Sequence, residues 1–366
     1  MTLRERIETV FHGGTPDAMV WYADLTYWYG AHARIGDLPA RWCGPRGIGQ
    51  IHRDYNVGEY VGGCNAYRMT HGDGVAITAE NNHGRSTTTW TTPVGTLTAV
   101  SEYSPLSFSA GILEHAVKEA EDLRVVRYLM EQRRYTAFPE ALAQIEAEYA
   151  EYGLPILAVP ASPISELNKT WSGVMTLSYL LADAPEEVEA TLEAIAASQQ
   201  QAYRLTAESP CPYVMICENL SAETMGGYFD HYIRDYLTKQ VAYLHAHGKK
   251  VIIHIDGTLR GVVEKIAGTG IDCIDAMTPK PVGDVGTDEI RALTGDDILI
   301  LGGLPGAMFA PPFTAADLEQ HVRDIIRLHK DSGRFMLGVA DQVPPNADIA
   351  LVRMVSELVD TYGRYA

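Results

Sequence analysis

A set of polar residues follows short apolar runs, and these are the side chains with which this chain could do chemistry. In a parallel barrel the carboxyl ends of the strands gather at one edge, and that edge carries the active site. The set comprises Asp24, Glu80, Asn81, His83, Glu218, Asn219, His254, Asp256, Asp275 and Asp341. The sequence therefore predicts one site built from carboxylates, amides and imidazole at strand ends.

The segment His254-Ile255-Asp256-Gly257 carries the strongest local signal. Alternate residues at a strand end point the same way, so an imidazole and a carboxylate two positions apart can share one ligand. This pair is half of an ordinary divalent metal site, and Glu218 or Asp341 from neighbouring strand ends can complete it. The alternative is that Asp256 satisfies His254 in a polar pocket without a metal, and the sequence leaves both interpretations open.

Glu218 and Asp341 each have a chemical and a structural interpretation. Glu218 closes an apolar run, where a carboxyl group can be a metal ligand or a general acid with a raised pKa. Asp341 precedes Pro344-Pro345, which forces an extended exit from the strand, and a simple turn cap is its alternative role. The residues predicted to be catalytic, which are also the candidate metal ligands, are Glu218, His254, Asp256 and Asp341.

Aromatic residues are concentrated between Trp21 and Tyr29. Most of these rings must pack in a core, but an aromatic wall beside Asp24 suits a flat apolar substrate. The residues expected to bind the substrate are Tyr22, Asp24, Trp28, Glu80, Asn81 and Asn219.

Short apolar runs alternate with amphipathic stretches from Leu154 onward, a pattern that predicts parallel strands joined by helices. Strands are expected at 18–22, 74–78, 155–159, 213–217, 250–254, 271–275, 298–301 and 334–338. Eight strands suit a closed (β/α)8 TIM barrel of the α/β class. A doubly wound open sheet is the rival fold, but it favours a glycine-rich turn after the first strand, and Ala23-Asp24-Leu25 is not one.

Two additions to this barrel are expected. Leu3-Arg4-Glu5-Arg6-Ile7 begins an amphipathic N-terminal helix. Residues 85–103 contain two strand-like runs around Pro93-Val94-Gly95, which predicts an inserted β-hairpin outside the barrel. Because no repeat or linker divides the sequence, residues 1–366 are expected to form a single domain.

The composition narrows the class of partners. The chain has 366 residues, of which 46% are hydrophobic and 21% charged, and a formal net charge of −18. This acidity disfavours binding to nucleic acid or to an anionic membrane surface, and no run approaches the roughly 18 apolar residues of a membrane helix. Five cysteines without a C-x-x-C pair argue against disulfides. The N-terminus lacks the pattern of a secretory signal, so we expect a cytoplasmic enzyme.

Five segments carry a resemblance that spans nearly the whole chain. They are Leu3–Ile7, Thr92–Leu97, His254–Gly257, Gly302-Gly303-Leu304 and Val343-Pro344-Pro345. Together they resemble the uroporphyrinogen decarboxylase superfamily, which includes the decarboxylase and cobalamin-dependent methyltransferases. The resemblance implies a TIM barrel.

Departures from the family patterns distinguish its branches. The decarboxylase has an arginine-rich stretch after the first strand and a histidine before the last helix, whereas residues 21–26 lack arginine here and Asp341 lies near that histidine's place. This arrangement suits a polyanionic tetrapyrrole poorly. Thiol methyltransferases of the superfamily carry His-x-Cys and a further cysteine, where this chain has His254-x-Asp256 and Asp341. Carboxylates are harder ligands than thiolates, so a metal bound by them favours an oxygen-bearing substrate over a thiol.

The pattern is similar to the substrate-side methyltransferases of O-demethylase systems. That resemblance implies transfer of a methyl group from a small methyl donor, such as an aryl methyl ether or a methylated amine, to the cob(I)alamin of a separate corrinoid protein, with zinc as the candidate metal. Two alternatives stay open: a lyase acting on a smaller carboxylic acid, and a barrel that only binds a corrinoid or tetrapyrrole. The sequence also leaves open whether the chain forms a homodimer.

Overall fold

The computed structural model describes residues 1–149 and 151–365. Contacts group the chain into two compact units: Met1–Cys64, Glu140–Ala158 and Pro210–Ala366 form the first, and Asn65–Pro139 with Val159–Ser209 form the second. The single domain expected from the sequence stays a prediction. Within the described ranges, no helix combines the length and apolar character needed to cross a membrane.

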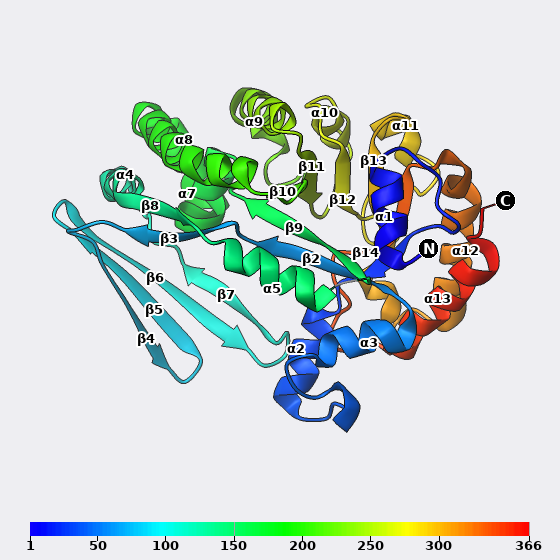
Figure 1. Cartoon of the computed structure of the whole chain (residues 1–366). Helices are drawn as coiled ribbons and strands as arrows, with labels where there is room; N and C mark the ends of the chain where they lie inside the picture. The colour runs from blue at the N-terminus through cyan, green and yellow to red at the C-terminus, as the bar shows by residue number, and fades with distance from the viewer. Residues whose placement is uncertain (150, 366) are drawn as a thin grey trace. The chain divides into compact units, whose positions relative to one another are not determined.

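The first unit is built around a closed barrel of eight parallel strands (Figure 1). In their order around the barrel these are β1 (Trp21–Ala23), β14 (Phe335–Ala340), β13 (Leu299–Pro305), β12 (Cys273–Met277), β11 (Lys250–Ile255), β10 (Tyr213–Leu220), β9 (Gly153–Val159) and β2 (Gly58–Cys64). Its helices are α1 (Leu3–Phe11), α2 (Thr26–Ile35), α3 (Gly47–Tyr55), α5 (Pro139–Tyr149), α9 (Arg234–Ala246), α10 (Val263–Ala267), α11 (Ile290–Thr294), α12 (Ala315–His329) and α13 (Ala350–Tyr362). The TIM barrel predicted from the sequence is confirmed.

The barrel strands are largely apolar because helices and the barrel interior cover both of their faces. Every residue of β9, β13 and β14 is buried. Gly302 in β13 has φ +134°, and a Cβ atom there would lie 2.7 Å from the backbone nitrogen of Met277 in β12. Glycine is therefore required where these two strands meet.

The prediction of the second barrel strand at 74–78 is wrong. That place is taken by β2, whose Gly58-Glu59 start and paired glycines do not form an apolar run. The predicted segment instead begins β4 (Ala76–Asn82), which is exposed along its whole length and pairs antiparallel with β5 (Arg85–Thr92). Glu80 and Asn81 lie opposite Thr87 and Ser86 in this pairing. They belong to the second unit and do not end a barrel strand.

The second unit contains the predicted hairpin within a larger sheet. Strands β5 and β6 (Gly95–Ser104) pair from Arg85 with Glu102 to Thr92 with Gly95, so the hairpin at 85–103 is confirmed. β4 and β7 (Ser109–Glu114) extend it to four strands, and β3 (Tyr67–His71) pairs separately with β8 (Arg133–Ala137). The helices of this unit are α4 (Leu123–Gln132), α6 (Pro163–Glu166), α7 (Gly173–Asp183) and α8 (Pro185–Glu208).

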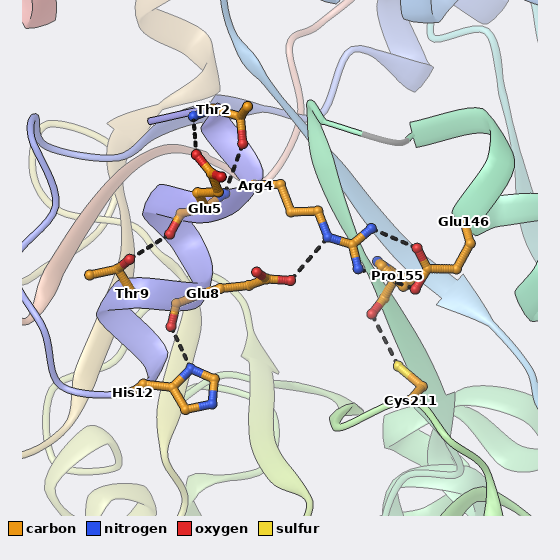
Figure 2. Close-up of polar contacts among 9 residues, drawn as sticks. All are labelled: Thr2, Arg4, Glu5, Glu8, Thr9, His12, Glu146, Pro155 and Cys211. Carbon is orange, nitrogen blue, oxygen red and sulfur yellow. Dashed lines mark hydrogen bonds and ion pairs between the residues drawn. The ribbon is translucent and has the colours of Figure 1, made fainter.

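The N-terminal helix α1 is present as predicted, and its polar contacts fix it to the barrel unit (Figure 2). Thr2 and Glu5 form a capping box, which satisfies backbone N–H groups that have no partner inside the helix. Arg4 donates to Glu8 at 3.0 Å and to Glu146 of α5 at 2.6 Å. Ile7 and Phe11 of α1 line a small cavity among the apolar residues of the barrel core, so the helix closes the apolar core on one side.

Glu59 of β2 is a buried carboxyl group, 5% exposed, and it makes stability depend on pH. Burial raises the pKa of Glu59 from 4.5 to about 8, with a further increase from the charge of Glu148 that Arg53 partly opposes. Because the folded-state pKa lies above the unfolded value, the protonated Glu59 carboxyl group favours the folded state. This contribution to stability is complete below the unfolded pKa and is lost as the pH rises through the folded pKa. We expect Glu59→Gln to raise the thermal unfolding midpoint by several degrees at about pH 8.5 and to change it little at about pH 5.

The difference between the two melting curves isolates Glu59 from its neighbour His52, whose Nε2 lies 3.9 Å from a Glu59 oxygen. Burial lowers the pKa of His52 to about 4. This histidine is present in both proteins, so its contribution to the pH dependence is common to both melting curves. Wild type and variant that lose stability in parallel between about pH 5 and 8.5 would contradict the assignment.

Candidate metal centre

His254 and Asp275 form a buried hydrogen-bonded pair at the centre of the site. His254 lies on β11 directly opposite Asp275 on β12 in the strand register. The His254 Nδ1 to Asp275 Oδ2 distance is 2.6 Å, and both side chains are about nine-tenths buried. A carboxylate bonded to Nδ1 keeps the proton on that nitrogen and leaves Nε2 to face the site.

Two further carboxylates converge on the other ring nitrogen. His254 Nε2 lies 3.7 Å from Asp256 Oδ2 and 3.8 Å from Asp341 Oδ1. One ligand atom from each of the three residues lies within 4.8 Å of the others. We call His254, Asp256 and Asp341 the three-residue cluster. The sequence predicted that these three residues would share one site, and the structure brings them together.

Asn219 orients Asp256 from the neighbouring strand. The register of β10 and β11 shifts between Cys217 and Leu220, so Glu218 and Asn219 form a bulge at the end of β10. Asn219 adopts a left-handed backbone with φ +49°, and its Nδ2 donates to Asp256 Oδ2 at 2.6 Å. Bulges commonly aim a side chain at an active site, and here the bulge brings the Asn219 amide to a cluster carboxylate.

The charges in the cluster shift two pKa values. Burial alone lowers the pKa of His254, but the hydrogen bond and charge of Asp275, with the charges of Asp256 and Asp341, raise it to about 9. Partial burial and the nearby carboxylates raise the pKa of Asp341 to about 6, although His254 opposes the shift. The neighbouring carboxylates therefore favour the imidazolium form of the His254 ring.

The donor set of the three-residue cluster fits a divalent metal. Zinc in catalytic sites takes three nitrogen or oxygen ligands from the protein and keeps one position open. A ligating histidine then donates its other N–H to a carboxylate, as His254 does to Asp275. Glu218, which is 1% exposed, lies outside this cluster, and its predicted roles as a metal ligand or a general acid stay predictions.

The predicted substrate residues occupy different environments. Trp28 is 5% exposed, stacks on His32 and donates to the carbonyl of Ala347 at 3.3 Å. Tyr22 is buried among barrel residues, and burial raises its pKa well above the ordinary value. Asp24 accepts hydrogen bonds from protein groups on both of its oxygens. Trp28 and Asp24 have structural partners, Tyr22 is buried in the barrel, and the substrate roles of all three residues stay predictions.

Two residues of the site were not assigned a role from the sequence. Asp275 ends an apolar run, which marked its position, but only the register of β11 and β12 reveals that it holds His254. Gln342 donates to Asp24 at 2.9 Å next to Asp341, and no pattern in the sequence distinguished it. Its position directly after Asp341, a candidate metal ligand, is the one sequence feature that could have pointed to Gln342.

We expect Asp275→Asn to weaken zinc binding by about 10–100-fold. The neutral amide at position 275 removes the negative charge that stabilises the His254 ring when it donates from Nδ1. In either orientation the amide also fixes the proton on Nδ1 less strongly than the carboxylate does. Titration calorimetry of the metal-free protein measures the change. Asp272→Asn is the matched control, because Asp272 accepts from His245 Nε2 at 2.8 Å in a separate His–Asp pair. Equal zinc affinity in wild type and Asp275→Asn would contradict the prediction.

Comparison with known proteins agrees with this architecture. The barrel with polar groups at its strand ends belongs to the TIM-barrel class. The sequence profile of the family described as uroporphyrinogen decarboxylase (URO-D) matches residues 109–362, more than half of the chain. The chain therefore belongs to the uroporphyrinogen decarboxylase family.

Two solved structures that resemble the chain have little sequence identity to it. A methyltransferase from Methanosarcina mazei is 12% identical, with 99% of each chain covered and a TM-score of 0.63. The GH18 chitinase ChiB from Flavobacterium johnsoniae is 9% identical, over 63% of this chain and 82% of its own, with a TM-score of 0.35. No curated protein sequence matches the chain. The likeness to the methyltransferase concerns the fold alone, and the chitinase is too distant to indicate a shared fold.

Proposed function

We propose that this protein is a methyltransferase that moves a methyl group from a small methylated substrate, such as an aryl methyl ether, to the cob(I)alamin of a separate corrinoid protein. The observation that carries the proposal is the three-residue cluster, in which two carboxylates face the free nitrogen of an oriented imidazole. Family membership and the fold shared with a methyltransferase from Methanosarcina mazei support it.

The methyl donor must be activated because a phenolate is a poor leaving group. As the methyl–oxygen bond breaks, the methyl group passes to the reduced corrinoid, and the electron pair of the bond stays on the oxygen. A bound zinc ion held by His254, Asp256 and Asp341 would supply Lewis acidity at that oxygen. Oxygen and nitrogen ligands without thiolate suit such an oxygen-bearing substrate.

The protein's own residues prepare this site. Asp275 fixes the His254 ring, and Asn219 fixes one Asp256 oxygen, so two of the three groups are held before the substrate binds. Pre-organised groups stabilise developing charge without reorganising during the reaction. In a metal-free route, the same His254 Nε2 can donate its proton to the departing oxygen.

Metal analysis and a methyl-transfer assay test the proposal. Purified protein is mixed with chemically reduced cobalamin and a panel of methyl donors, including 2-methoxyphenol and methylated amines, and the cobalamin spectrum is followed. We expect methylation of the cobalamin with a methoxyarene and release of the free phenol. An absence of methyl transfer with every donor would remove the proposal.

The second candidate is a lyase for a smaller carboxylic acid, which the name of the matching family favours. The same site would then release carbon dioxide, and cobalamin would have no effect on turnover. Four carboxyl groups give this site a negative charge: Asp24, Asp256, Asp275 and Asp341. This negative charge disfavours a substrate with several carboxylates. Carbon dioxide release from a panel of carboxylic acids separates the two functions.

A further inference from the structure

The segment that carries Asp341 is fastened to the start of the barrel. Residues 341–347, which we call the 341–347 loop, follow β14. The backbone N–H of Val343 donates to the carbonyl oxygen of Asp24 at 3.0 Å. Gln342 Nε2 donates to Asp24 Oδ2 at 2.9 Å. Asp24 therefore contacts the two residues that come directly after Asp341, once through its backbone and once through its side chain.

Other contacts restrain the same loop from both sides. His32 Nε2 lies 2.9 Å from the carbonyl oxygen of Pro345, and Trp28 Nε1 donates to Ala347. On the other side, a Cβ atom at Gly306 would lie 2.3 Å from the Gln342 carbonyl oxygen, so only glycine permits this close approach. Because helix α2 and Gly306, the residue after β13, both contact the loop, a change at Gln342 is expected to shift Asp341 locally rather than release the whole loop.

The carboxylate of Asp24 is occupied by protein donors. Its Oδ1 accepts from the backbone N–H of Thr26 at 2.8 Å and from the Thr26 hydroxyl at 2.5 Å. Its Oδ2 accepts from Gln342, whose Nε2 also donates to the Thr26 hydroxyl at 3.0 Å. A carboxylate with three such bonds has little remaining capacity to bind a substrate.

We infer that Asp24 is a positioning residue, which holds Gln342 and thereby directs the adjacent Asp341 toward His254 Nε2. The inference rests on the proposed metal site and replaces the substrate contact expected for Asp24 from the sequence. Asp341 is the cluster member that needs such help, because its side chain is 54% exposed whereas that of His254 is 12% exposed. Packing restrains an exposed carboxylate little, so the position of its backbone decides whether one of its rotamers reaches the ligand point.

Gln342→Ala is the main test, because it removes the contact without changing the charge of the site. We expect zinc affinity to fall about tenfold, measured by calorimetry on metal-free protein without methyl donor or corrinoid. Gln320→Ala is the matched control, because Gln320 donates to Asp324 at 3.1 Å in a similar bond on α12. The readout does not use methyl transfer, so the positioning role and the proposed function can fail independently.

A double-mutant cycle and a reversed hydrogen bond complete the test. If Asp24 acts through Gln342, Asp24→Ala combined with Gln342→Ala costs no more zinc affinity than the larger single change. Asp24→Asn with Gln342→Glu reverses donor and acceptor at constant net charge and is expected to keep affinity within about threefold of wild type. Unchanged zinc affinity in Gln342→Ala, additive losses, failure of the reversed pair, or a wild type that binds no zinc would each overturn the inference.

Discussion

Replacing His254 by alanine is expected to lower kcat/KM for methyl transfer at least about 10³-fold and to abolish tight zinc binding. The imidazole is the single nitrogen donor of the three-residue cluster. In the metal-free route the same change removes the proton donor, so both routes predict a large loss. The initial rate of cobalamin methylation and a zinc titration measure the two effects.

His12→Ala is the control for this experiment. His12 is exposed at the end of α1, and its Nδ1 lies 2.7 Å from the Glu8 carbonyl oxygen. The control is expected to keep both activity and zinc affinity. A His254→Ala protein that folds, melts like the wild type and still transfers methyl groups at more than a tenth of the wild-type rate would place the chemistry elsewhere.

The barrel could be predicted from the sequence because most of its buried parallel strands contain a short apolar run. Seven of the eight strand segments expected from apolar runs overlap barrel strands, including 250–254 within β11 and 298–301 with β13. The failure at β2 has a physical cause. This strand begins with Gly58 and Glu59, and Glu59 is buried as a carboxyl group that burial drives toward its neutral form. Composition alone marks such a segment as a loop.

The pairing within the site could be predicted only in part. Alternation along one strand placed His254 and Asp256 together, because residues two positions apart share a face. The partners that hold them depend on geometry between strands. Asn219 reaches Asp256 through a bulge of β10, and Asp275 reaches His254 through the register of β11 with β12. The pattern of residue types predicts neither the bulge in β10 nor the register between β11 and β12.

Aromatic residues near a strand end were a weaker guide than charged ones. Trp28 and Tyr22 are buried, and Trp28 packs on His32 and against the edge of Trp42. Large rings stabilise a core wherever it has room for them, so their position near a strand end carries little functional information. A charged group at the same place must find a partner, which makes its position more informative.

Replacing the carboxylate ligands of the three-residue cluster by thiolates is expected to change both metal affinity and methyl transfer, because the two ligand types favour different chemistry. Soft thiolates bind zinc more tightly than carboxylates do and lower its Lewis acidity toward oxygen. Asp256 and Asp341 approach a common point with His254, so cysteines at both positions can reach the same metal. Zinc–sulfur bonds of about 2.3 Å, against 2.0–2.2 Å for oxygen, partly compensate for the shorter side chain.

Asp256→Cys combined with Asp341→Cys is expected to tighten zinc binding at least about tenfold and to reduce methyl transfer from a methoxyarene at least about 100-fold. The cobalt-substituted variant should gain a thiolate-to-cobalt charge-transfer band that the parent lacks. All proteins carry Cys43→Ser, because Cys43 is an exposed native thiol. Asp256→Cys alone serves as control and should show a weaker band, since one thiolate then binds instead of two. A double variant whose band is no stronger than that of Asp256→Cys alone would mean that the two side chains do not meet at one ion, because each thiolate that binds cobalt adds to this absorption.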